Sequence, residues 1–137
     1  MTFHLNHDEG LIGRATFFVD HGLLMIEDPE SSDLHDGWDA ASEYVSIAEN
    51  SIYLSVQPSV DGPVEIGIFK SDDASDFVDG AAVYFDGSIS TGSGWIIIHD
   101  ANDVMRFTVR RPKGSGRVKV LVDRAGLASR VRITLFS

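Results

Sequence analysis

The sequence predicts an all-β fold: a single-domain antiparallel β-sandwich of about nine strands with at most one or two short helical turns. Two observations predict this fold. Apolar and polar residues alternate along most of the chain, which is the period of a strand with one buried face. Turn-forming residues separate these stretches at short intervals. With 137 residues, 43% of them hydrophobic, the chain has the size and composition of one domain, so residues 1–137 are expected to form one domain.

Turn signals place the individual strands. His21–Gly22 predicts a hairpin between the first two strands, Asn50 a tight turn between the next two, and Asp61–Gly62–Pro63 a turn before the fifth. The stretch GSISTGSG at 87–94 lacks the lysine of a phosphate-binding loop and predicts a flexible connection. The expected strands are 14–20, 23–28, 43–49, 51–57, 63–70, 81–87, 94–100, 104–111, 117–124 and 130–137.

Alternation also assigns the two faces of the last three strands. The apolar side chains at every second position are expected in the core: Phe107, Val109, Val118, Val120, Val131 and Ile133. The intervening basic residues, including Arg106, Lys119 and Arg132, are therefore expected on the solvent side. That basic face is either an ordinary wet surface or a site for an anion or an acidic neighbour.

Helical signal is confined to two places. Trp38, Ala41 and Val45 are three to four residues apart, which favours one or two helical turns after Asp36. Ser71 is a candidate N-cap for a short turn within 71–80.

The charge of the chain is negative and unevenly distributed. Eleven basic and 21 acidic residues give a formal net charge of −10, which argues against direct binding of nucleic-acid phosphates. It favours a basic partner, with solubility as the simpler explanation. Residues 1–80 contain two basic and seventeen acidic residues, a balance of −15, whereas residues 81–137 contain nine and four, a balance of +5. The two halves either pair within the fold or act as poles for weak, salt-sensitive self-association into a homo-oligomer.

No constellation of catalytic or metal-binding residues is evident. The chain has no cysteine, so it has no thiolate nucleophile and no cysteine zinc site. Ser93 in TGSGW lacks the spacing of a nucleophile elbow. His4 and His7 are three apart, which suits a metal on a helix, and no helix is indicated there. We therefore expect no enzymatic activity, no cofactor and no metal.

One alternative involves calcium. The acidic residues Asp72, Asp73, Asp76 and Asp79 form a cluster, although the EF-hand pattern is absent. A calcium-dependent or small-ligand-binding β-sandwich module, with its site in these Asp-rich loops, is the second functional hypothesis.

The segment EDPESSDLHDGWDAASE, residues 27–43, combines seven acidic residues with one tryptophan and no basic residue. Tryptophan is enriched at binding hot spots, so one hypothesis makes Trp38 an anchor for a basic protein. The rim that steers this partner would consist of Asp33, Asp36, Asp39 and Glu43. The alternative places Trp38 in the core at one end of the sandwich, with the acids capping turns.

Two groups of segments resemble a known family. The first comprises LLMIED, DLHDGWDAASEY and AENSIYLSV, within 23–57, and the second is GWIIIHDANDVMRFTVRRPKGSGRVKVLV, within 81–122. Their order and pattern resemble the competence protein J (ComJ) family of small inhibitors of a DNA-entry nuclease. The resemblance implies a non-catalytic inhibitor of the competence or immunity type whose basic partner is a nuclease. This family offers no catalytic motif to transfer, so the role of Trp38 and its acids remains an inference from this sequence.

The sequence also suggests a cellular location. It has no apolar run of about 18 residues, so no membrane span is expected. The first ten residues, MTFHLNHDEG, lack a basic region followed by an apolar stretch, so no signal peptide is expected. A cytoplasmic bacterial protein is the resulting expectation.

Overall fold

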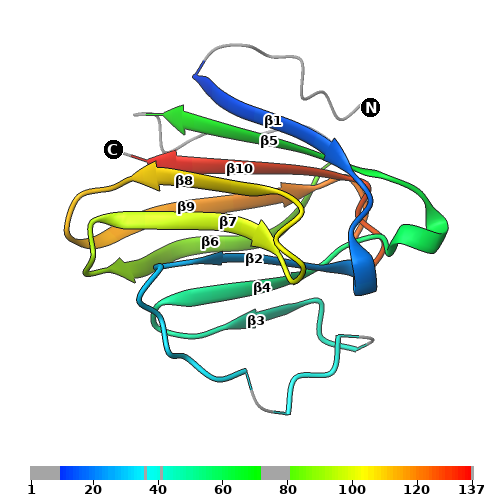
Figure 1. Cartoon of the computed structure of the whole chain (residues 1–137), viewed down its shortest axis with the longest axis horizontal. Coiled ribbons are helices and arrows are strands. Elements are labelled where there is room, and N and C mark those ends of the chain that lie inside the picture. Colours follow the sequence, from blue (N-terminus) through cyan, green and yellow to red (C-terminus); the bar gives the residue numbers. More distant parts are fainter. Residues whose placement is uncertain (1–9, 36, 41, 72–80, 137) are drawn as a thin grey trace.

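Ten strands form two five-stranded sheets in the computed structural model, which describes residues 10–35, 37–40, 42–71 and 81–136 (Figure 1). Sheet A has the order β1–β5–β10–β9–β6 and sheet B the order β3–β4–β2–β7–β8. Sheet A contains β1 (Leu11–Phe17), β5 (Val64–Ser71), β6 (Ala82–Thr91), β9 (Gly114–Val122) and β10 (Arg130–Phe136). Sheet B contains β2 (Leu23–Glu27), β3 (Val45–Ile47), β4 (Ser51–Ser55), β7 (Trp95–Asp100) and β8 (Arg106–Arg110). The predicted all-β sandwich is confirmed, with β5 and β10 as a parallel pair among antiparallel ones.

The connection between β1 and β2 differs from the predicted hairpin. β1 pairs with β5 in sheet A, whereas β2 pairs with β4 and β7 in sheet B. The chain crosses between the sheets through the 3₁₀ turn η1 (Asp20–Gly22), where φ is 59° at His21 and 63° at Gly22. These left-handed conformations redirect the chain across the sandwich, so the two strands are not neighbours. The hairpin predicted at Asn50 is confirmed by the antiparallel pairing of β3 with β4.

Strand β6 is longer than the sequence predicts. Residues Ser88 to Thr91, predicted as part of a flexible connection, continue the antiparallel pairing of β6 with β9. The hydroxyl of Thr91, which is buried, donates to the carbonyl of Pro112 at 2.8 Å. The hydroxyl of Ser90 likewise donates to the carbonyl of Gly114 at 3.3 Å, so both hydroxyl groups have backbone partners in the extended strand.

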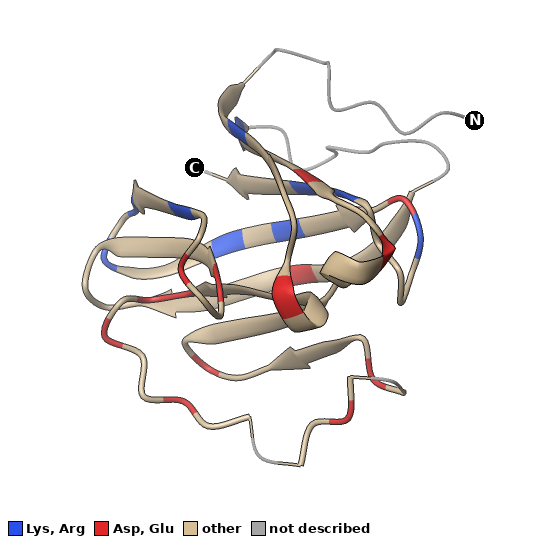
Figure 2. Cartoon of the chain, turned by 45° about the vertical axis from the view of Figure 1, so that its right-hand side comes forward, with Lys and Arg blue, Asp and Glu red and all other residues tan. Residues whose placement is uncertain are grey.

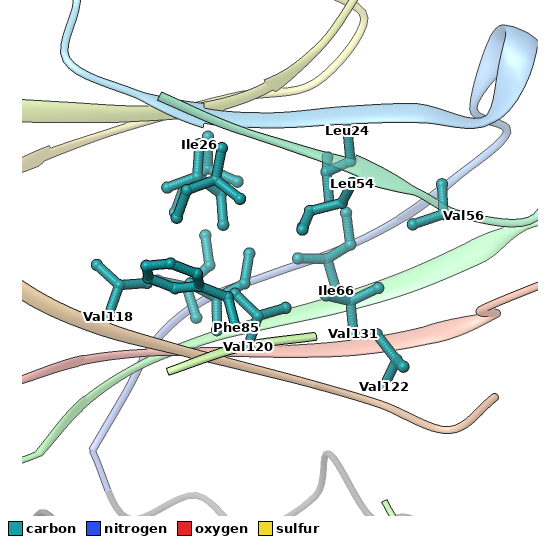
Figure 3. Packing of buried hydrophobic residues seen from close by; sticks show 14 of the residues in the cluster. Leu24, Ile26, Leu54, Val56, Ile66, Phe85, Val118, Val120, Val122 and Val131 are labelled. Atoms are coloured by element: carbon teal, nitrogen blue, oxygen red, sulfur yellow. The ribbon is translucent and has the colours of Figure 1, made fainter. Parts of the chain in front are cut away.

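The core lies between the two sheets and is made mostly of branched aliphatic side chains (Figure 3). Side chains of sheet B, such as Leu24, Ile26 and Leu54, face those of sheet A, such as Ile66 and Val120. The predicted core side chains of β9 (Val118 and Val120) and β10 (Val131 and Ile133) are 0–1% exposed. Those of β8, Phe107 and Val109, are partly buried against the same cluster. The predicted register of the last three strands is therefore confirmed.

The basic residues on the other face of these strands are less exposed than predicted. Arg106 is exposed, but Lys119 is only 8% and Arg132 only 7% exposed. The guanidinium of Arg132 lies 3.7 Å from the ring centroid of Phe69, which is itself buried. The prediction of a fully solvated basic face is wrong for these two residues, because part of the outer face of sheet A forms a second packed layer around Phe69 and Leu121.

Helical structure in the described residues is limited to two 3₁₀ turns, η1 and η2 (Ser59–Asp61). The described residues around Trp38 form isolated turns, so the helical turns predicted after Asp36 are not found there. The turn predicted within 71–80 lies outside the described residues except for Ser71, which belongs to β5. None of the helical segments described is long and apolar enough to cross a membrane.

Candidate partner-binding surface

The acidic segment, residues 27–43, connects β2 to β3 and loops past the β3 edge of sheet B (Figure 1). Figure 2 shows acidic residues distributed along its described part and no basic residue on it. Side chains at its start and in its middle attach it to the rest of the fold.

Asp28 fixes the start of the acidic segment. Its buried carboxylate accepts hydrogen bonds from the backbone N–H of Glu30 at 2.8 Å and from the backbone N–H and hydroxyl of Ser93 at 3.1 and 2.9 Å. Ser93 lies in the turn between β6 and β7, so Asp28 ties the segment to that turn. The hydroxyl that the sequence placed in a partial nucleophile elbow is thus engaged in a structural hydrogen bond.

Protonation of Asp28 is expected to weaken the fold at low pH. Burial acts to raise the pKa of Asp28, but the three hydrogen bonds from Glu30 and Ser93 outweigh it and hold the pKa below its usual value. Because the folded-state pKa is depressed, the stabilisation is present above the unfolded-state pKa of about 3.9 and is lost as pH falls through the folded value. Urea unfolding followed by circular dichroism at about pH 7 and at lower pH should show a smaller pH dependence for Asp28→Asn than for the unmodified chain.

The matched control is Asp61→Asn, which changes an exposed aspartate on η2. It should keep most of the pH dependence. An Asp28→Asn variant that loses stability on acidification as steeply as the unmodified chain would contradict the assignment.

Asp33 and His35 hold the middle of the acidic segment against sheet B. The carboxylate of Asp33 accepts the backbone N–H of Asn50 at 2.6 Å. His35 Nδ1 lies 2.8 Å from Ser46 Oγ, and His35 Nε2 lies 2.6 Å from Ser51 Oγ. The imidazole also stacks on the ring of Tyr53, with centroids 3.6 Å apart and planes at 11°. The Asp33 carboxylate therefore stabilises the β3–β4 turn by a hydrogen bond in addition to carrying charge.

Burial is the largest cause of the pKa shifts of His35 and Tyr53. Burial lowers the pKa of His35, although the carboxylates of Asp33 and Glu27 act to raise it. Burial also raises the pKa of the Tyr53 hydroxyl, and the same two carboxylates raise it further. The histidine and tyrosine rings consequently favour their neutral forms, which suits their stacking on one another.

The Ser51–His35 pair has the short contact of a serine nucleophile and its base, but its setting argues against that chemistry. Ser51 is 0% exposed, so no substrate reaches its hydroxyl in this structure. The other ring nitrogen of His35 contacts the hydroxyl of Ser46, whereas in a Ser–His–Asp triad a carboxylate holds that position. The pair is best explained as a clamp for the acidic segment.

Trp38 packs on the outer face of sheet B and lies outside the sandwich core. Its indole lies edge-on to Tyr53, with ring centroids 6.0 Å apart at 65°, and its Nε1–H donates to the carbonyl of Glu43 at 2.5 Å. Tyr53 points away from the core because its strand neighbours Ile52 and Leu54 are both core residues. The alternative in which Trp38 plugs one end of the core is therefore wrong, and part of its side chain remains exposed.

The structure separates the predicted acidic rim into different environments. Asp39 and Glu43 are exposed on either side of the turn that follows Trp38, and Asp39 accepts the hydroxyl of Ser42 at 3.1 Å. Asp33 is half-buried and bonded to the β3–β4 turn. Asp36 lies outside the described residues. Asp39 and Glu43 are thus the described members of the rim that remain accessible.

Sequence reasoning missed the residues beneath the tryptophan. Tyr53 contacts the indole edge-on and His35 stacks on Tyr53, and farther across sheet B Glu27 lies 2.6 Å from His99 Nε2. The alternation of SIYLS was a usable signal, because it places Tyr53 on the face opposite Ile52 and Leu54. His35 had no comparable signal, since its two serine partners come from different strands.

The other candidates from the sequence fall in parts of the chain that the structure does not describe. His4, His7 and the calcium candidates Asp72, Asp73, Asp76 and Asp79 lie outside the described residues. Within the described part of the chain, no group of three or more histidines and acids is arranged to hold a metal ion.

Comparison with known proteins shows similarity in structure. No protein-family model and no curated protein matches the chain. The chain is similar to the crystal structure of ComJ from Bacillus subtilis, an inhibitor of the DNA-degrading activity of NucA, with a TM-score of 0.67 and 12% identity over 93% of this chain and 96% of that one. It is also similar to the protein described as crocagin biosynthetic gene J, with a TM-score of 0.59 and 16% identity over 93% and 95% of the two chains. The divergent resemblance to competence protein J is therefore confirmed as a shared fold across nearly the whole chain.

Proposed function

We propose that this chain is a non-catalytic acidic inhibitor that binds and neutralises a basic protein, specifically a nuclease that degrades DNA. The observation that carries the proposal is the acidic segment itself, which is held on the outside of sheet B by Asp28, Asp33 and His35 and presents a partly exposed tryptophan. A segment anchored in this way is ordered before a partner arrives, which reduces the entropy lost on binding. The fold shared with an inhibitor of NucA supports a nuclease as the partner.

Trp38 and the acids have different roles in this proposal. Trp38 is the main energetic contact, because a large, rigid aromatic side chain buries much apolar area at low entropic cost. Asp33, Asp36, Asp39 and Glu43 provide the negative field that speeds encounter with a basic surface. Since nuclease active sites accommodate a polyanion, carboxylates at such a surface compete with DNA for the same positive charges.

Inhibition of DNA degradation tests the proposal. The purified chain should inhibit at least one member of a panel of purified DNA-degrading nucleases with basic surfaces, including NucA, at near-stoichiometric ratio, as measured by loss of cleavage of a labelled duplex. Inhibition should weaken as salt rises, because screening shortens the reach of the acidic field. Excess DNA should also weaken inhibition, because the chain and DNA compete for the same basic surface of the nuclease.

The double variant Asp39→Asn/Glu43→Gln should inhibit less at low salt, and Val83→Gln, which changes an exposed residue on β6, should inhibit normally. A gel-shift control should detect no binding of the chain to the duplex itself. The proposal would be overturned if no nuclease in the panel were inhibited.

A further inference from the structure

A groove of about 530 Å³ opens at the end of the sandwich that carries η1. Figure 2 brings this end of the molecule toward the viewer. Residues from four separate stretches of chain line the groove, two of them in sheet B or its connections and one in the turn between β9 and β10. The lining residues are His21, Ala40, Tyr44, Ser55, Val56, Pro58 and the run from Arg124 to Leu127.

Hydrogen bonds between the two sheets hold the groove in shape. The hydroxyl of Tyr84 in sheet A donates to the carbonyl of Ser55 at 2.8 Å and accepts the backbone N–H of Gly126 at 2.7 Å. The backbone N–H of Gln57 donates to the carbonyl of Ala128 at 2.8 Å. These contacts cross from sheet B to the β9–β10 turn, so the floor and one wall exist before any ligand binds.

The groove lining contains exposed apolar side chains. Tyr44 and Leu127 are 40% and 41% exposed, and Pro58 and the buried Val56 also belong to the lining. Gly126, at φ 88°, leaves room for the Tyr44 ring, because a Cβ at that position would lie 3.0 Å from two of its ring carbons. Exposed apolar side chains gathered around a preformed hollow mark a binding site more often than chance exposure does.

Three exposed carboxylates flank residues of the groove lining in the sequence. Asp20, Asp39 and Glu43 are each adjacent in sequence to a lining residue, and all three are exposed. Arg124 is the sole lysine or arginine among the lining residues. The three flanking carboxylates and Arg124 together give a formal balance of 1 − 3 = −2, and Ala40 and Tyr44 connect the groove to the acidic segment.

We propose that this groove receives an apolar side chain of the basic partner, flanked in the partner's sequence by lysine or arginine. The inference rests on the proposed function for the existence of a basic partner and adds where that partner inserts its anchor. The volume is within the range of about 300–1,000 Å³ typical of ligand pockets, which is ample for one aromatic side chain. Trp38 directly precedes the stretch from Asp39 to Glu43, which contributes Ala40 to the groove lining and leads into Tyr44, so the same acids steer the partner to both contacts.

Three short peptides test the occupant. Amide chemical shifts of the ¹⁵N-labelled chain are followed while acetylated, amidated Lys-Lys-Trp-Lys-Lys, Lys-Lys-Ser-Lys-Lys and Glu-Glu-Trp-Glu-Glu are added. The basic Trp peptide should shift Tyr44, Gly126 and Leu127 and bind at least about tenfold more tightly than either other peptide. Equal binding of the two Trp peptides would mean that the groove takes a neutral ligand, and equal binding of the two basic peptides would mean that charge alone acts. Either result overturns the proposal.

Two substitutions test the groove by different routes, one by removing an apolar contact and one by filling the hollow. Leu127→Asp adds a favourable negative charge but removes an apolar contact, and Ala125→Trp fills the hollow from an exposed position. Both should reduce the affinity for the basic Trp peptide to within about twofold of the affinity for the Ser peptide. Ile12→Asp is the matched control, because Ile12 is 45% exposed and lies at the opposite end of β1 from η1.

The nuclease assay separates this inference from the proposed function. If the unmodified chain inhibits a nuclease and Leu127→Asp and Ala125→Trp inhibit it equally well, the groove is not the anchor site although the inhibitor function stands. If the chain inhibits no nuclease but the peptide results are as expected, the groove stands as a site for basic apolar segments and the nuclease proposal fails.

Discussion

Replacing Ile26 with alanine is expected to lower the free energy of unfolding by about 2–5 kcal/mol. Ile26 is 0% exposed on β2, the central strand of sheet B, where it is paired with Ile52 on one side and Ile98 on the other. Truncation removes apolar area from the core and leaves a cavity that flanking strands close only partly. Because a domain of this size has a total stability of about 5–15 kcal/mol, the loss should be obvious in urea or thermal unfolding followed by circular dichroism.

The matched control is Ile47→Ala, which makes the same chemical change in the same sheet. Ile47 lies on edge strand β3 and is 59% exposed, so the free energy of unfolding should change by no more than about 0.5 kcal/mol. Equal losses in the two variants would show that the core does not lie between the sheets as described.

The period of two was enough to predict the sandwich, because it records which side of each strand is buried. It assigned Val118, Val120, Val131 and Ile133 to the core correctly, since burial on one face requires this alternation. It could not tell which strands pair. The two strands on either side of His21–Gly22 lie in different sheets, and a short connection with a glycine is compatible with either a hairpin or a crossing turn.

The prediction of the basic face failed for a related reason. Alternation places Lys119 and Arg132 opposite the core, but it does not say whether that opposite face is wet. In the structure, Arg132 lies over Phe69 with its long side chain largely covered. The packing of a second layer depends on residues distant in sequence, which a local pattern does not encode.

The contacts of the acidic segment also could not be predicted from a local sequence pattern. Its composition predicted a charged surface with a tryptophan, but the attachment of that surface depends on pairs such as Asp33 with Asn50 and His35 with Ser51. These partners are separated by more than ten residues and come from different elements. The groove was not predicted at all, because its walls come from four stretches that only the fold brings together.

Replacing Trp38 with alanine is expected to weaken binding of the basic partner by about 2 kcal/mol or more, chiefly through faster dissociation. The indole touches the outer-face residue Tyr53 and donates to Glu43, and it takes no part in the core between the sheets. Its loss should therefore lower the melting temperature much less than Ile26→Ala does. Surface plasmon resonance with the inhibited nuclease, together with a thermal melt of the same variant, measures both quantities.

Trp95→Ala provides the matched control for this substitution. Trp95 also belongs to sheet B and is 39% exposed, but it lies on β7 beside the guanidinium of Arg110, which is 5.5 Å from its ring. It is not part of the acidic segment, so its removal should leave the dissociation rate nearly unchanged. If the two tryptophan variants weaken binding equally, the anchor is not specific to Trp38.

The acids are expected to act on the association rate. Neutralising the exposed pair, Asp39→Asn with Glu43→Gln, should slow association and flatten its dependence on salt while leaving dissociation almost unchanged. Asp33→Asn needs separate treatment because the same change weakens its bond to the Asn50 backbone, so it should lower stability as well. A partner whose association is indifferent to the exposed pair, and whose dissociation is indifferent to Trp38, does not bind through this segment. In that case the segment is only a surface connection, held in place by Asp28, Asp33 and His35 to cover the outer face of sheet B.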